Sequence, residues 1–194
     1  MSPRYPKLVA LDLDRTIWTS YLNDKKFGDH GWVHGDLRNN LELANPTTIR
    51  DKRNHSHTLH LASDIPWIIH DLHSHDVKIA IVSRNTNKDL CDRAMWHFKA
   101  KDKHGKLRHL TDFIKYDEII NEPKQNHLRR IHGWSKIPYS EMLFFDSQMS
   151  NEITEELLGL TFHYVADTKR ALTKEEYKRG LELWRHNRVD AKHH

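Results

Sequence analysis

The chain has 194 residues, of which 37% are hydrophobic and 30% are charged. This length and composition are typical of one globular domain with a sizeable core. No stretch approaches the ~20 apolar residues that a membrane helix needs, so we do not expect a membrane protein. The first residues, MSPRYPK, contain no hydrophobic region, so no signal peptide is expected. The single cysteine, Cys91, excludes an internal disulfide and favours a reducing, cytoplasmic location.

The charge balance is only mildly basic, with 31 Lys and Arg against 27 Asp and Glu. Such a surface can attract phosphorylated ligands. The sequence has no recognised nucleic-acid module and no interleaved row of aromatic residues, so nucleic-acid binding is not expected. The 17 histidines are scattered and match no zinc-ligand spacing, and we interpret them as surface residues. We expect a monomer or a weak dimer.

The first predicted element lies in the stretch Lys7–Trp18, which reads KLVALDLDRTIW. The apolar run at residues 8–11 is typical of a strand buried on both faces of a parallel sheet. Asp12 and Asp14 follow where the strand ends, and their i, i+2 spacing lets both carboxylates face one small volume. Two such carboxylates repel each other unless a cation such as Mg²⁺ relieves them. The alternative is an acidic turn, since Asp is a common turn residue.

Residues 19–62 are predicted to form a small cap over the aspartate pair. The part from 19 to 45 shows little periodicity, and loops of this length are usually functional or carry small elements of their own. The alternating patch HTLHL at 57–61 follows a polar turn at 51–54 and predicts a β-hairpin within 47–62.

Strands and helices alternate over the rest of the chain. The predicted elements are a helix from its N-cap Ser63 to Leu72, a strand at 77–82, a helix at 87–98, a charged surface loop at 99–109, a strand at 113–120, a helix from Lys124 after Pro123, a strand at 141–146, a helix at 151–158 ended by Gly159, a strand at 161–165, and a helix capped by Thr173 that runs to Trp184 before the chain frays. This alternation predicts a single α/β domain over residues 1–190, with a Rossmann-like parallel sheet between two layers of helices.

Further polar residues stand where other predicted strands end. Ser83 and Arg84 follow the strand at 77–82, Lys124 begins a helix, and Asp146 ends the strand at 141–146. Each has an ordinary alternative when considered alone, as a turn residue, a helix cap or a solvated surface charge. Their occurrence together with the aspartate pair favours one functional site.

The stretches LDLDRTIW, IAIVSRN and MLFFDSQMSNE occur in this order. They resemble the eukaryotic magnesium-dependent phosphatase family of the haloacid dehalogenase (HAD) superfamily, which has DLDYTLW, ASRT and FFDDExRN at the corresponding places. The resemblance spans nearly the whole chain, including the insert after the first motif. It implies a HAD-like fold and a Mg²⁺-dependent phosphatase that hydrolyses phosphate monoesters through an aspartyl-phosphate. The substrate would be a phosphorylated small molecule or a phosphorylated residue.

The resemblance also implies roles for the three aspartates. Asp12 would be the nucleophile, and Asp14 would be the general acid and base that protonates the leaving oxygen and then activates water. Asp12, the main-chain carbonyl of Asp14 and Asp146 would bind Mg²⁺.

Four other positions would hold the substrate by the same resemblance. Ser83 would hydrogen-bond the transferring phosphoryl group, and Lys124 would neutralise charge on that group and on the nucleophile. Arg84 is a candidate for holding the substrate, because its planar fork matches phosphate oxygens. Tyr21 would contact the substrate from the loop after the first motif.

Two positions depart from the family's pattern. Ser147 follows Asp146 where the family has a second aspartate, which should weaken Mg²⁺ binding unless Asn151 or Glu152 compensates. This leaves an alternative function, a catalytically weakened HAD-fold module that binds a phosphorylated ligand or a partner. Arg15 replaces the family's tyrosine, and it either favours a more anionic substrate or projects outward.

Overall fold

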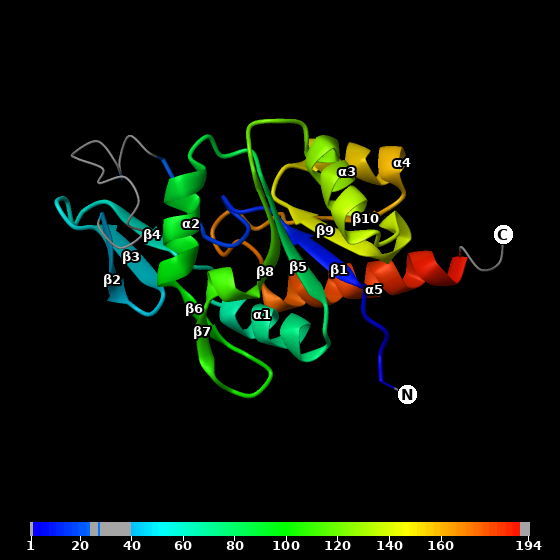
Figure 1. Cartoon of the computed structure of the whole chain (residues 1–194), viewed down its shortest axis with the longest axis horizontal. Helices are drawn as coiled ribbons and strands as arrows, with labels where there is room; N and C mark the ends of the chain where they lie inside the picture. Colours follow the sequence, from blue (N-terminus) through cyan, green and yellow to red (C-terminus); the bar gives the residue numbers. More distant parts are fainter. Residues whose placement is uncertain (1, 24–26, 28–39, 191–194) are drawn as a thin grey trace.

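The computed structural model describes residues 2–23, 27 and 40–190. A five-stranded parallel sheet lies at its centre, with the strand order β10-β9-β1-β5-β8 (Figure 1). Its strands are β1 (Leu8–Leu11), β5 (Lys78–Ser83), β8 (Ile114–Ile119), β9 (Met142–Asp146) and β10 (Thr161–Tyr164). All five strands were predicted, and the parallel α/β fold is confirmed.

Helices cover both faces of this sheet. They are α1 (Ile65–Ser74), α2 (Lys88–His97), α3 (Lys124–Ser135), α4 (Ile153–Leu158) and α5 (Lys174–Asp190), with 3-10 turns η1 (Leu110–Phe113), η2 (Tyr139–Glu141) and η3 (Met149–Glu152). Figure 1 shows α1 and α5 below the sheet and α3 and α4 above it. No helix in the described ranges is long and apolar enough to cross a bilayer.

The central strand β1 is buried because alternate side chains enter two different cores. Val9 and Leu11 pack in a cluster with residues of α1, α2 and α5. Leu8 and Ala10 pack in a second cluster with residues of α3. Two apolar faces explain why this strand reads as a continuous apolar run rather than an alternating one.

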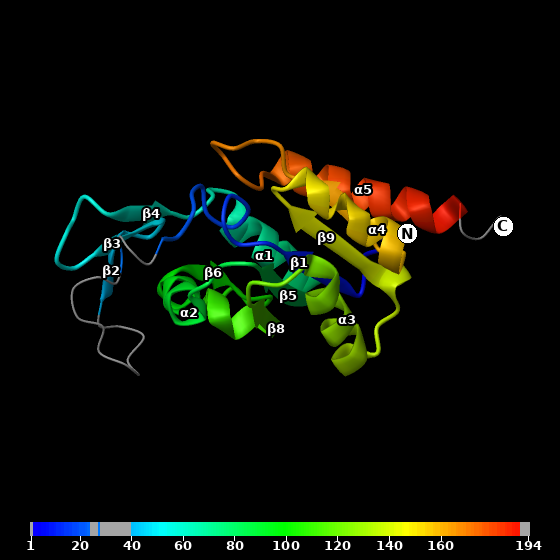
Figure 2. The same cartoon turned by 90° about the horizontal axis from the view of Figure 1, so that it is seen from above.

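An antiparallel sheet of three strands follows the first motif. It consists of β2 (Leu41–Asn45), β3 (Thr48–Asp51) and β4 (Thr58–His60). The predicted hairpin within 47–62 is therefore confirmed as β3 and β4, and β2 is an additional strand. Figure 2 shows this sheet at one end of the molecule, far from the C-terminal end of α5. Residues 24–26 and 28–39 lie outside the described residues, so the extent of the cap at 19–62 stays a prediction.

The prediction of a charged loop at 99–109 was wrong. This segment is a hairpin of β6 (Lys99–Lys101) and β7 (Leu107–His109). The buried carboxylate of Asp102 accepts the amides of His104 and Lys106 and pairs with Arg108 at 2.7 Å, which stabilises the turn. Apart from Ala100 the hairpin buries little apolar surface, so its sequence lacks a strand pattern.

Two helix ends differ from the prediction. α1 begins one residue later than expected, with Asp64 rather than Ser63 at the N-cap position. α5 continues past Trp184 to Asp190. On this last part of α5, Arg188 forms a 2.6 Å ion pair with a buried glutamate. A contact of that kind is tertiary, so local sequence does not reveal it.

The histidines are not all surface residues. His127 on α3 is fully buried, and its ring nitrogens lie 3.3 Å from the main-chain carbonyls of Glu118 and Glu122. Burial lowers the pKa of His127 below the ordinary histidine value, so the neutral ring is favoured. A neutral ring has a single N–H, so His127 can donate to only one of these two carbonyls, and it is a packing residue of α3.

Gly180 is the point where α5 approaches the sheet. A Cβ there would lie 2.5 Å from two ring carbons of the buried Phe145. We expect Gly180→Ala to destabilise the protein by about 1–3 kcal/mol, because overpacking outweighs the better helix propensity of alanine. Gly133→Ala in α3 is the control, since its Cβ meets nothing within 4 Å and should raise stability by up to ~1 kcal/mol. Urea unfolding measures both, and equal stability of the two variants would contradict this packing argument.

Candidate active site

The polar residues at the strand ends lie together in one pocket of about 320 Å³. Asp146 ends β9, Asp12 follows β1, Ser83 ends β5, and Lys124 begins α3 after β8. These strands are neighbours in the sheet, so the four side chains converge. The full lining is Asp12, Asp14, Arg15, Tyr21, Ser83, Arg84, Asn85, Asn121, Lys124, Asp146, Ser147 and Gln148. The structure thus brings together all seven side chains predicted for the site.

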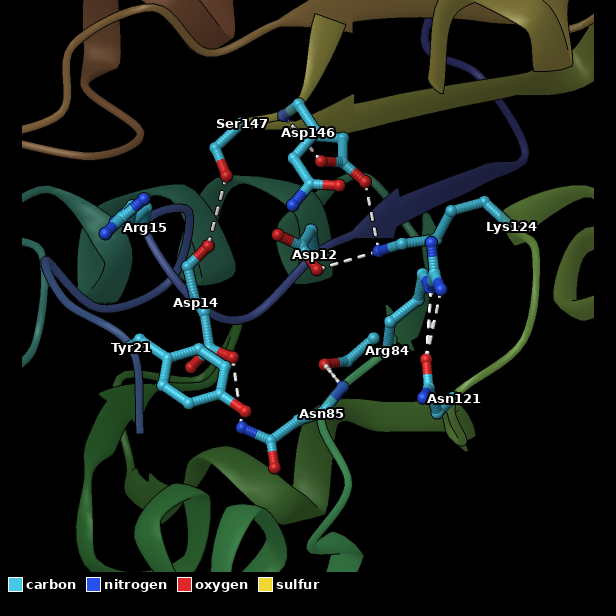
Figure 3. A pocket seen from close by; sticks show the side chains of 12 residues that line it. Asp12, Asp14, Arg15, Tyr21, Arg84, Asn85, Asn121, Lys124, Asp146 and Ser147 are labelled. Carbon is cyan, nitrogen blue, oxygen red and sulfur yellow. Dashed lines mark hydrogen bonds and ion pairs between the residues drawn. The ribbon is translucent and has the colours of Figure 1, made fainter. Parts of the chain in front are cut away.

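A buried ion-pair cluster forms the floor of this pocket (Figure 3). The ammonium of Lys124 donates to Oδ1 of Asp12 at 2.7 Å and lies 3.0 Å from Oδ2 of Asp146. It also donates to the main-chain carbonyl of Val82. The side chains of Lys124 and Asp146 are only 2% and 1% exposed, so water screens these charges weakly.

The pKa values of Asp12 and Lys124 are set by their burial and by the two carboxyl groups that surround one ammonium. Burial raises the pKa of Asp12 to about 7; Lys124 opposes this shift, and the nearby Asp146 adds to it. Burial lowers the pKa of Lys124, but the two carboxylates outweigh it and hold that pKa above the ordinary lysine value. One ammonium faces two carboxyl groups, and the excess negative charge favours the binding of a further cation.

Asp14 presents two different groups to the site. Its carboxylate accepts from the indole N–H of Trp18 at 2.8 Å, the amide of Leu22 at 2.8 Å and Nδ2 of Asn85 at 3.0 Å. Burial raises the pKa of Asp14, and these three donors oppose that shift. Its main-chain carbonyl accepts from the hydroxyl of Ser147 at 3.2 Å, on the opposite side from the carboxylate (Figure 3).

The donors on the floor suit a hard cation. The carboxylates of Asp12 and Asp146, the carbonyl of Asp14 and the hydroxyl of Ser147 are all oxygen donors, which Mg²⁺ prefers. Within residues 2–23, 27 and 40–190, no three side chains of His, Cys, Asp or Glu are grouped so that they could hold a metal. A Mg²⁺ ion here would therefore rely on two carboxylates and one main-chain carbonyl.

Asp146 is held in place by its own loop. Its Oδ1 accepts the amide of Gln148 at 2.8 Å, and its Oδ2 accepts Nδ2 of Asn151 at 2.9 Å. Of the two residues expected to compensate for Ser147, Asn151 contacts the carboxylate, whereas Glu152 is exposed and does not line the pocket.

The predicted substrate-binding residues line the same pocket, where Ser83 is buried and Arg84 and Tyr21 are exposed. The hydroxyl of Ser83 accepts the amide of Asn85 at 3.1 Å, which leaves its own proton available for a phosphate oxygen. Nε and Nη2 of Arg84 donate to the amide oxygen of Asn121 at 3.3 and 3.1 Å. The side chain of Tyr21 is 50% exposed at the mouth.

Sequence reasoning missed three residues whose side chains orient the site. Asn85 and Trp18 orient the carboxylate of Asp14, and Asn121 orients Arg84. Asn85 carried a usable signal, because it stands two residues after Ser83 at the end of the same strand. Asn121 carried none, because it lies in the loop between β8 and α3, and only the fold brings it to the pocket.

Solved structures first identify the class of fold. A phosphatase-domain part of a Bacteroides fragilis protein, complexed with Mg, aligns with a TM-score of 0.57 and 20% identity over 92% of this chain and 40% of that chain. This chain thus spans less than half of that one. A HAD family enzyme of Bacteroides thetaiotaomicron, solved as a magnesium complex, aligns with a TM-score of 0.57 and 13% identity over 91% of this chain and 100% of that chain. The fold is that of the HAD-like hydrolases.

Sequence comparison then identifies the family. Residues 4–187 match the acid phosphatase family, so the chain belongs to that family. It is 28% identical over 158 residues to a HAD-like hydrolase superfamily protein of Schizosaccharomyces pombe, covering 81% of this chain and 84% of that protein. It is 25% identical over 181 residues to human magnesium-dependent phosphatase 1, covering 93% and 88% of the two chains.

Proposed function

We propose that this protein is a Mg²⁺-dependent phosphatase that hydrolyses phosphate monoesters through an aspartyl-phosphate on Asp12. Membership of the acid phosphatase family and similarity to a magnesium-dependent phosphatase support the reaction class. The observation that carries the mechanism is the buried contact of Lys124 with both Asp12 and Asp146 at the carboxyl edge of the sheet. This arrangement combines a nucleophile, a fixed positive charge and a second carboxylate for the metal.

The first half of the reaction transfers the phosphoryl group to the protein. A carboxylate oxygen of Asp12 forms a bond to phosphorus while the ester P–O bond breaks, and Asp14 gives a proton to the leaving oxygen. Lys124 stabilises the negative charge on the phosphoryl oxygens, and the hydroxyl of Ser83 donates a hydrogen bond to one of them. Mg²⁺ held by Asp12, the Asp14 carbonyl and Asp146 would supply further charge neutralisation.

The second half regenerates the carboxylate. Asp14, now ionised, accepts a proton from water, and the water oxygen attacks phosphorus of the aspartyl-phosphate. The P–O bond to Asp12 breaks, which releases inorganic phosphate and restores both aspartates. The hydrogen bonds from Trp18, Leu22 and Asn85 keep the Asp14 carboxylate oriented through both halves.

The substrates proposed are phosphorylated small molecules or phosphorylated residues. The open pocket, with Tyr21 exposed at its mouth, supports accessible phosphate groups of this kind. A monomer or weak dimer in the cytoplasm is part of the proposal, and the single buried Cys91 supports the reducing compartment.

A Mg²⁺ titration of aryl phosphate hydrolysis tests this function. We expect turnover that saturates with Mg²⁺ and disappears with a chelator. Ser147→Asp should lower the Mg²⁺ concentration at half-maximal rate by about 10-fold, because it adds a carboxylate beside Asp146. Ser150→Asp is the matched control, since it adds the same charge at an exposed position that does not line the pocket.

Ser147 also favours a second candidate function, a HAD-fold module that binds a phosphorylated ligand with weakened catalysis. Its hydroxyl donates to the Asp14 carbonyl where the family has a second carboxylate. This second function would be supported, and the first contradicted, if the native chain hydrolysed no aryl phosphate at any Mg²⁺ concentration and Ser147→Asp recovered turnover.

A further inference from the structure

We propose that the pocket selects phosphate monoesters whose leaving group carries a second anionic group, recognised by Arg15 and Arg84. Both arginines line the pocket, both are exposed, and neither belongs to the buried cluster of Asp12, Lys124 and Asp146. We call the two guanidinium groups the cationic rim. This inference rests on the proposed function and adds the substrate class.

Arg84 holds a positive charge that its partner does not neutralise. Two of its N–H groups donate to Oδ1 of Asn121, which is a neutral amide oxygen. Among the described residues, no carboxylate lies within ion-pair distance of Arg84. Asn121 therefore orients the guanidinium at the pocket mouth and leaves its charge for a ligand.

Arg15 is presented to the pocket by a strained backbone. Its φ of 60° lies in the left-handed region, which is uncommon for a residue with a side chain. The amides of Thr16 and Ile17 both donate to the carbonyl of Leu13, so the turn around Arg15 is fixed. Across the described ranges, no hydrogen bond or ion pair engages the guanidinium of Arg15.

Most other arginines in the described residues form ion pairs with carboxylates. Those in ion pairs with Asp or Glu are Arg4, Arg50, Arg108, Arg130, Arg170, Arg179 and Arg188. The cationic rim thus stands out as a pair of uncompensated guanidinium groups at one pocket. Uncompensated cations beside a phosphate-binding floor attract an additional anion.

The buried cluster at the floor of the pocket and the cationic rim would bind different parts of a substrate. Figure 3 shows Arg15 and Arg84 on opposite sides of Asp12. A phosphoryl group at Asp12 and Lys124 directs its leaving group toward the mouth, where Tyr21 exposes half of its surface. A carboxylate or a second phosphate on that leaving group would meet the cationic rim, where charge-assisted hydrogen bonds would hold it.

Two matched aryl phosphates test this specificity. We would compare kcat/KM for 4-carboxyphenyl phosphate with that for its neutral analogue, 4-carbamoylphenyl phosphate. The native chain should prefer the carboxylate by about 10-fold. Arg15→Gln and Arg84→Gln should each reduce this ratio toward one, and the Lys variants should restore part of it because the charge returns. Arg53→Gln, which removes an exposed arginine outside the pocket, should leave the ratio unchanged.

Binding of non-hydrolysable probes separates this inference from the proposed function. Calorimetry with Mg²⁺ would compare 4-carboxybenzylphosphonate with 4-carbamoylbenzylphosphonate on the same variants. Tighter binding of the carboxylate, lost in Arg15→Gln or Arg84→Gln, supports the inference even if neither phosphate ester turns over. A ratio near one in the native chain, or a ratio that neither Gln variant changes, overturns the inference even if both esters are hydrolysed.

Discussion

Asp12→Asn is expected to lower kcat/KM for an aryl phosphate by at least about a thousandfold, because an amide cannot form the aspartyl-phosphate. The fold should survive the change, because Lys124 keeps its 3.0 Å contact with Asp146. The change also removes the repulsion between the two carboxylates that share Lys124. Steady-state kinetics with saturating Mg²⁺ measures the first effect, and thermal unfolding measures the second.

Asp89→Asn is the control for this variant, because it removes an exposed carboxylate in the first turn of α2. It should keep full activity. Retention of normal turnover by Asp12→Asn, with identity confirmed by mass, would refute the nucleophilic role and with it the aspartyl-phosphate mechanism.

Lys124→Met is expected to abolish turnover and to destabilise the protein by about 3–5 kcal/mol without Mg²⁺, because two buried carboxylates lose their shared partner. Adding Asp12→Asn to this variant should recover part of the stability, since the repulsion between the carboxylates is relieved. Urea unfolding of the native chain, the two single variants and the double variant gives a double-mutant cycle for this pair.

Lys115→Met is the matched control, because Lys115 is an exposed lysine on β8. Its stability should change by less than about 0.5 kcal/mol. Additive effects in the double variant would contradict the coupling between Lys124 and Asp12, and an unchanged stability of Lys124→Met would show that the cluster is not an ion pair in solution.

The sheet and the core of the site were predictable because their signals are local. An apolar run such as Leu8–Leu11 predicts a doubly buried strand wherever it occurs. Once the strands were placed, parallel topology alone put Asp12, Ser83 and Asp146 at one edge.

The parts that could not be predicted depend on contacts between distant segments. The hairpin of β6 and β7 is stabilised by the buried carboxylate of Asp102, which sits in a run of charged residues without strand periodicity. The end of α5 depends on Arg188 and its buried glutamate partner. In the site, Asn121 reaches Arg84 only because β5 and β8 are neighbours.

The ion-pair cluster has a consequence for the order of events during folding. Lys124 and Asp12 are 112 positions apart, and the contact between Ser147 and the Asp14 carbonyl spans 133. Contacts at such separations form slowly. During synthesis, Asp12 and Asp14 leave the ribosome long before Lys124 and Ser147 are synthesised. No N-terminal fragment ending before β9 can contain the complete cluster. Hydrolytic competence is therefore acquired late, when the two halves of the sheet join.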